Sequence, residues 1–141
     1  MDRGTVFRWP VRVYWEDTDA GGIVFYANYL KFFERARTEW LRALGVGQQA
    51  LRDAEGGFFV VSETVVRYRL PARLDDELWV TAGLGESGRA SLRVVQQAWR
   101  GGELLCEGDI RIGWVDARTL RPGRIPATIT AALSTSRPPS E

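Results

Sequence analysis

Residues 16–37 read EDTDAGGIVFYANYLKFFERAR and join an acidic, glycine-containing loop to the clearest helix of the sequence. Residues 17–22 interrupt the pattern of a preceding strand, which predicts a loop. Apolar side chains then recur at three- and four-residue spacing, which predicts a helix with one buried face. They are Tyr29, Phe32, Phe33, Ala36, Trp40 and Leu44. We expect the helix to begin between Tyr26 and Asn28 and to end before Gly45.

Alternating apolar residues around this helix predict strands. In the first strand, Val11, Val13 and Trp15 share one side. The predicted strands cover residues 7–15, 58–70, 78–84, 90–98 and 104–114, and two short helices cover 48–54 and 126–133. Short turns favour antiparallel neighbours, so this order predicts an α+β fold in which the long helix lies against a five-stranded antiparallel sheet.

The length and composition predict one ordinary globular domain. The chain has 141 residues, of which 45% are apolar and 26% charged. We place the domain at residues 1–133 and a Ser/Pro-rich tail at 134–141. Formal net charge is +1, so charge gives no argument for binding nucleic acid or an acidic membrane. The free edges of a five-stranded sheet need cover, which predicts an oligomer.

Several sequence features favour the cytoplasm. Cys106 is the only cysteine, so an intrachain disulfide is excluded, and its place on the apolar side of a strand predicts burial. The start, MDRGTVFRWP, lacks the pattern of a signal peptide. No apolar run approaches the length of a membrane span, so we expect no membrane insertion.

The three acids Glu16, Asp17 and Asp19 could cap the helix, bind a metal ion or take part in catalysis. A D-x-D pair can hold Mg²⁺, but two carboxylates alone supply few ligands, and the chain has no histidine to add another. We therefore expect no metal site. For Glu16 and Asp17 the favoured interpretation is that they position the loop.

Two segments carry a family resemblance, VRVYWEDTDAGGIVFYANYLKFFERARTEWLR and YRLPARLDDELWV. They resemble the 4-hydroxybenzoyl-CoA thioesterase family of the hotdog fold, and most of all the branch of acyl-CoA thioesterases found with the bacterial Tol–Pal system. The resemblance spans roughly residues 7–126. It implies a sheet wrapped around one long helix, and hydrolysis of an acyl-CoA to a free acid and CoA without a cofactor. It also implies a homodimer or homotetramer with the CoA site between subunits.

The resemblance assigns roles within the opening stretch. It implies that Asp19 is the catalytic carboxylate, acting as a base for water or as the nucleophile. It implies that the backbone N–H of Tyr26, at the helix start, holds the oxyanion. The Tol–Pal branch usually has histidine at this position. A backbone donor survives that replacement, whereas side-chain acid–base catalysis by a tyrosine with a pKa near ~10 does not.

Substrate contacts are expected at Gly22, Val24, Gly88 and Arg89. Arg67 and Arg69 are further candidates for the CoA phosphates. Two other functions are compatible with a hotdog fold. A hotdog hydratase would normally pair histidine with a carboxylate, so the lack of histidine counts against it. The alternative that stays open is a non-catalytic acyl-thioester-binding or scaffold protein.

Overall fold

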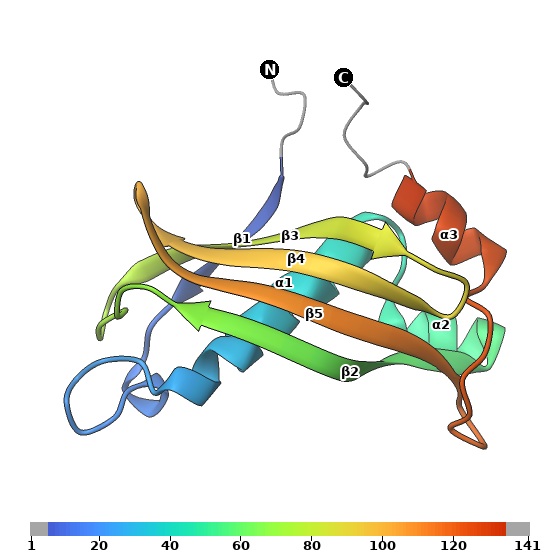
Figure 1. Cartoon of the computed structure of the whole chain (residues 1–141), viewed down its shortest axis with the longest axis horizontal. Helices are drawn as coiled ribbons and strands as arrows, with labels where there is room; N and C mark the ends of the chain where they lie inside the picture. Colours follow the sequence, from blue (N-terminus) through green and yellow to red (C-terminus); the bar gives the residue numbers. More distant parts are fainter. Residues whose placement is uncertain (1–5, 135–141) are drawn as a thin grey trace.

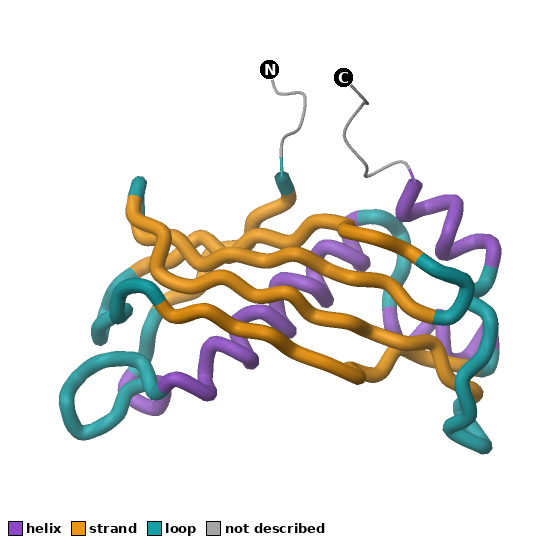
Figure 2. The backbone as a smooth tube through the Cα atoms, viewed as in Figure 1, coloured by secondary structure: helices purple, strands orange, loops and turns teal. Residues whose placement is uncertain are grey.

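One long helix, α1 (Tyr29–Ala43), lies across a five-stranded antiparallel sheet in the computed structural model, which describes residues 6–134 (Figures 1 and 2). The strands are β1 (Phe7–Arg12), β2 (Gly57–Tyr68), β3 (Glu77–Ser87), β4 (Ser91–Arg100) and β5 (Glu103–Asp116). Two shorter helices are α2 (Gln48–Glu55) and α3 (Ala127–Ser134). The sheet order is β1-β3-β4-β5-β2, with every neighbouring pair antiparallel. The predicted α+β architecture is confirmed.

The apolar stripe of α1 faces the sheet as predicted. Its buried members are Tyr29, Phe32, Phe33, Ala36, Trp40 and Leu41. Leu44, predicted as the last member, is the half-buried C-cap. Gly45 follows with φ of +86° and donates its N–H to Arg42 O, so it ends the helix as expected. A short 3₁₀ turn, η2 (Tyr26–Asn28), precedes α1, so helical backbone begins within the predicted window.

The prediction that the first strand continues to Trp15 is wrong. β1 ends at Arg12, and the Trp15 side chain is 79% exposed, whereas Val11 and Val13 are buried. The Tyr14 N–H donates to Asp17 Oδ2 at 2.9 Å, and the chain turns into a 3₁₀ segment, η1 (Trp15–Asp17). Alternation alone could not reveal this bend, because the carboxylate that stabilises it lies beyond the alternating residues.

A buried polar bridge joins α1 to the sheet, and the sequence pattern did not reveal it. Gln96 shares the apolar face of β4 and is fully buried. Its amide donates to Phe33 O at 2.9 Å and Thr81 O at 3.1 Å, and its oxygen accepts from Arg37 Nη1 at 3.0 Å. Because each amide group is paired, burial leaves no unsatisfied polar atom here.

Cys106 is buried in the core, as predicted from its place in β5. Burial raises the pKa of its thiol to about 12, so the thiol keeps its proton near neutral pH.

Ser134, which we placed in the tail, is the last residue of α3, and the remainder of that predicted tail lies outside the described residues. None of the described helices is long and apolar enough to cross a membrane.

Gly108 lets α1 approach the sheet closely. A Cβ at this position would lie 2.8 Å from Phe33 Cε2 and 2.9 Å from Ile110 Cδ1, both in the packed core. We therefore expect Gly108→Ala to lower the free energy of unfolding by about 1–3 kcal/mol through overpacking. Chemical denaturation measures the change. Gly102→Ala is the matched control, because a Cβ there meets nothing within 4 Å; an equal effect of both variants would contradict the packing argument.

Candidate active site

The acidic loop holds the Asp19 carboxylate through its own backbone. Asp19 Oδ1 accepts the Gly21 N–H at 2.9 Å, and Asp19 O accepts the Gly22 N–H at 3.0 Å. Gly22 has φ of +79°, a conformation that glycine adopts without strain. The second carboxylate oxygen, Oδ2, accepts no hydrogen bond from residues 6–134. The exposed side chain thus has one oxygen fixed by the loop and one available for chemistry.

Asp17 joins this loop to the helix start. Its side chain is 5% exposed, and its carboxylate accepts the Tyr14 N–H. Its backbone oxygen accepts both the Phe25 N–H at 3.0 Å and Asn28 Nδ2 at 2.9 Å. These contacts match the interpretation that Asp17 positions the loop. Glu16 is exposed.

The helix start presents two backbone N–H groups without partners among residues 6–134, those of Tyr26 and Ala27. The carbonyls of the same two peptide groups are both bonded. Phe25 O accepts the Asn28 N–H at 2.8 Å, and Tyr26 O accepts the Tyr68 hydroxyl at 3.0 Å. Free N–H groups at a helix start carry partial positive charge and suit an anionic oxygen.

Aromatic rings surround this helix start. The Tyr26 and Tyr68 rings meet edge to face with centroids 6.1 Å apart, and Tyr68 also contacts Tyr29 at 5.6 Å. Phe25 lies 4.8 Å from Tyr26. The Tyr26 ring is 63% exposed, so its side chain faces outward while its backbone belongs to the helix start. Tyr68 has no signal in the sequence beyond the alternation of a strand, so it was not among the predicted site residues.

Of the predicted substrate contacts, Gly22 lies in the acidic loop, whereas Val24 follows the loop and its side chain packs in the core beneath it. Val24 is buried in the core and donates its N–H to Ala72 O at 2.9 Å. Its side chain therefore offers little surface to a ligand, and it supports the loop from inside. The Thr18–Val24 bridge closes the loop between its two ends.

The β3–β4 turn, which contains Gly88 and Arg89, lies at the opposite end of the sheet from the loop that precedes α1 (Figure 1). The sheet register explains the separation. Ser91, which follows their turn, pairs with Gly113 of β5, near the Gly57 end of β2, whereas Tyr68 is at the other end of β2. One chain therefore does not bring these two groups of predicted site residues together.

The turn that contains Gly88 borders a polar pocket of about 480 Å³. Its lining residues are Glu86, Ser87, Gly88, Ser91, Leu92, Arg93 and Arg111. Arg93 pairs with Asp109, and this hydrogen bond lowers the pKa of the Asp109 carboxyl. Arg111 faces Glu63 at 3.7 Å, so it is the more available cation. Neither arginine was predicted. The earlier candidate Arg69 is already paired with Glu107.

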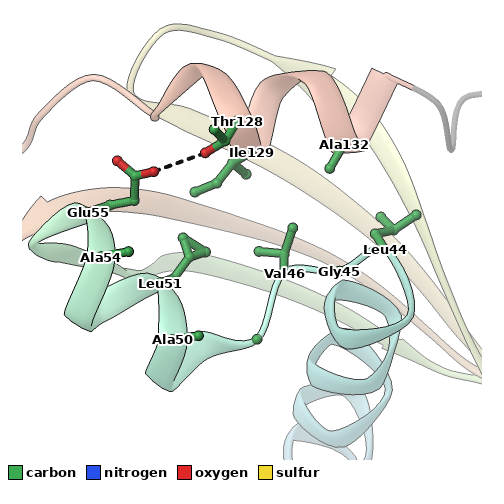
Figure 3. Close-up of a pocket in the computed structure, with 11 residues that line it drawn as sticks. Leu44, Gly45, Val46, Ala50, Leu51, Ala54, Glu55, Thr128, Ile129 and Ala132 are labelled. Atoms are coloured by element: carbon green, nitrogen blue, oxygen red, sulfur yellow. Dashed lines mark hydrogen bonds between the residues drawn. The ribbon is translucent and has the colours of Figure 1, made fainter.

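A separate apolar pocket of about 390 Å³ lies between the end of α1, α2 and α3 (Figure 3). Leu51, Ile129 and Ala132 point into it, and a hydrogen bond of 3.1 Å from Thr128 Oγ1 to Glu55 closes one side.

Within residues 6–134, no group of three or more His, Cys, Asp or Glu side chains is arranged to hold a metal ion.

A long helix crossed by five antiparallel strands, with a carboxylate loop at the helix start, defines a hotdog-fold protein of the thioesterase class. The chain matches the model of the thioesterase-like superfamily over residues 13–133, and it belongs to this superfamily. The family resemblance of its sequence is confirmed.

Named relatives agree with this membership. The chain is 41% identical over 133 residues to the acyl-CoA thioesterase YbgC of Haemophilus influenzae, covering 94% of this chain and 96% of that protein. It is 45% identical over 128 residues to the acyl-CoA thioester hydrolase YbgC of Escherichia coli O157:H7, covering 90% and 95%. The crystal structure of a probable thioesterase from Bartonella henselae superposes with a TM-score of 0.83 at 31% identity, covering 86% and 100%.

Proposed function

We propose that this protein hydrolyses acyl-CoA thioesters to a free acid and CoA. The observation that best supports this function is that the same segment contains two elements. One is the carboxylate of Asp19, held by its loop, and the other is a helix start whose Tyr26 N–H has no partner among residues 6–134. Thioester hydrolysis needs these two elements, a base or nucleophile and a donor for the oxyanion. The YbgC relatives carry the names of acyl-CoA thioesterases, which supports the same activity here.

The chemistry balances without a cofactor. Asp19 takes a proton from water as the oxygen attacks the thioester carbonyl, and the oxyanion that forms is stabilised by the Tyr26 N–H and the helix dipole. Collapse of this intermediate expels the CoA thiolate, which takes up the proton. In the alternative route, Asp19 attacks the carbonyl carbon directly and the C–S bond breaks, expelling the CoA thiolate. Water then cleaves the resulting anhydride, which releases the free acid, restores the Asp19 carboxylate and supplies the proton for the CoA thiol. Both routes consume one water and change no oxidation state, so the reaction needs no redox cofactor. Asp19 and the Tyr26 N–H supply the base or nucleophile and the oxyanion donor, so we propose no metal.

A dimer formed through β2 would complete the site. One edge of β2 pairs with β5, and β2 is an edge strand of the described sheet, with Val60, Val61 and Val65 exposed along it. Antiparallel pairing with a second copy across a two-fold axis would reverse the strand, so the Gly57 end of one copy would meet the Tyr68 end of the other. The partner's turn with Gly88 and Arg89 would then lie near Asp19.

This shared site predicts complementation between two defective chains. Asp19→Asn removes the carboxylate, and Arg89→Ala is expected to raise KM by weakening CoA binding. When both chains are co-expressed with different tags, about a quarter of the sites should combine an intact Asp19 with an intact Arg89 from the other chain. Steady-state kinetics should then reveal a fraction with wild-type KM. Recovery of no such fraction would contradict a CoA site between subunits.

A homotetramer is the larger assembly we propose. Among residues 6–134, no helix lies on the face of the sheet opposite α1 (Figure 1), so pairing of two dimers could cover this face. We also propose a cytoplasmic location, which the buried, reduced Cys106 supports. Association with the Tol–Pal system is an expectation that rests on the sequence resemblance alone.

The decisive test of activity is a thiol-release assay of the purified protein on short, long and aromatic acyl-CoAs. We expect turnover of at least one of these classes. Binding of acyl-CoA without any turnover would instead favour the non-catalytic acyl-thioester-binding or scaffold protein, whose supporting observation is Tyr26 in place of the usual histidine.

A further inference from the structure

We propose that Tyr68 is a positioning residue for the oxyanion site: its hydroxyl fixes the Tyr26–Ala27 peptide group, so that the Ala27 N–H becomes a second donor beside the Tyr26 N–H. This inference rests on the proposed thioesterase function. Tyr68 lies at the end of β2, and its hydroxyl donates to Tyr26 O at 3.0 Å across a sequence separation of 42 residues.

The hydrogen bond from the Tyr68 hydroxyl to Tyr26 O orients the Ala27 N–H, because both groups belong to one rigid peptide unit. A trans peptide is planar, with its C=O and N–H on opposite sides, so fixing the Tyr26 carbonyl also fixes the direction of the Ala27 N–H. The preceding peptide is fixed in the same way, because Phe25 O accepts the Asn28 N–H at 2.8 Å. Two successive peptide groups are thus held by their carbonyls, and both of their N–H groups lack partners among residues 6–134.

The Tyr68 ring is itself held in place. It contacts the rings of Tyr26 and Tyr29, so the hydroxyl meets the carbonyl from a constrained direction. Desolvation, with smaller contributions from Cys106 and Tyr26, raises the pKa of the Tyr68 hydroxyl, which therefore remains a donor throughout the neutral range. A hydrogen bond to a peptide carbonyl also polarises that peptide and strengthens its N–H as a donor. Tyr68 acts through Ala27 and need not touch the substrate.

The test is Tyr68→Phe, which keeps the ring contacts and removes only the hydroxyl. We expect kcat to fall about three- to tenfold, the loss of roughly one hydrogen bond, while KM stays within about twofold. The nuclear magnetic resonance signal of the Ala27 amide should shift at the same time, because its own peptide carbonyl loses a bond. An unchanged kcat together with an unchanged Ala27 signal would overturn the proposal.

Tyr29→Phe is the matched control. The Tyr29 hydroxyl accepts the Ala72 N–H at 3.1 Å in the core, so its removal should lower the melting temperature and leave kcat unchanged. An equal fall of kcat in both variants would overturn the positioning role, since any disturbance of the aromatic cluster would then suffice.

A fluorinated tyrosine at position 68 provides a pH readout. Its hydroxyl loses the proton at lower pH than that of tyrosine, and a phenolate cannot donate to Tyr26 O. We expect kcat to gain a falling limb as pH rises through the pKa of the substituted side chain; a profile identical to that of the wild type would overturn the inference. If the wild type hydrolyses no acyl-CoA at all, the thioesterase proposal fails, while the Ala27 signal still reports whether Tyr68 holds the peptide.

Discussion

Asp19→Asn is expected to lower kcat for acyl-CoA hydrolysis by about 10²- to 10⁴-fold, the usual contribution of a general base. The amide can neither accept the proton from water nor attack the thioester. The loop should nevertheless stay in place, because the asparagine oxygen can still accept the Gly21 N–H that Asp19 Oδ1 accepts at 2.9 Å. The loss should therefore appear in kcat, with little change in melting temperature.

Glu16→Gln is the matched control for this experiment. Glu16 also belongs to the acidic segment, but its side chain is exposed, and we place it outside the catalytic machinery. Thiol release by this variant should equal that of the wild type. Equal rates for wild type and Asp19→Asn would contradict the assignment of Asp19. A similar loss in both variants would show instead that the negative charge of the segment, and no single carboxylate, supports the reaction.

The fold could be predicted from the sequence because periodicity reports which side of an element is buried. The stripe from Tyr29 to Trp40 and the alternation in β3 and β5 were sufficient for the architecture. Periodicity failed where a distant or polar group decides the outcome. Trp15 continues an alternating pattern but lies beyond the bend stabilised by Asp17, and Gln96 occupies an apolar face because Arg37 and two carbonyls satisfy it.

The candidate site could be predicted from the sequence only in part, for a related reason. Asp19, Gly22 and Tyr26 lie within eight residues of one another, so a local motif can specify them. Tyr68 reaches the same place from the end of β2, and such a contact across the fold has no local signature. The β3–β4 turn, which contains Gly88 and Arg89, lies at the far end of the sheet, so the part in the site that we propose for them would require a second copy, which a single sequence does not display.

Tyr26→Pro is expected to lower kcat by about 10²- to 10³-fold, the usual effect of removing one oxyanion donor. Proline deletes the backbone N–H, which side-chain substitutions leave intact. The position suits proline, because Tyr26 is the first residue of η2 and its N–H has no partner among residues 6–134. The preceding residue, Phe25, already has the extended conformation that proline requires, with φ of −61° and ψ of 131°.

Tyr26→Ala separates the backbone from the side chain, because it removes the same ring and keeps the N–H. If the backbone is the donor, the alanine variant should retain most of the wild-type kcat, while the proline variant loses it at a similar melting temperature. Comparable activity of the two variants would contradict a donor role for the Tyr26 N–H. An equal loss in both variants would instead assign the role to the tyrosine side chain, which both substitutions remove, in the position where the Tol–Pal branch usually has histidine.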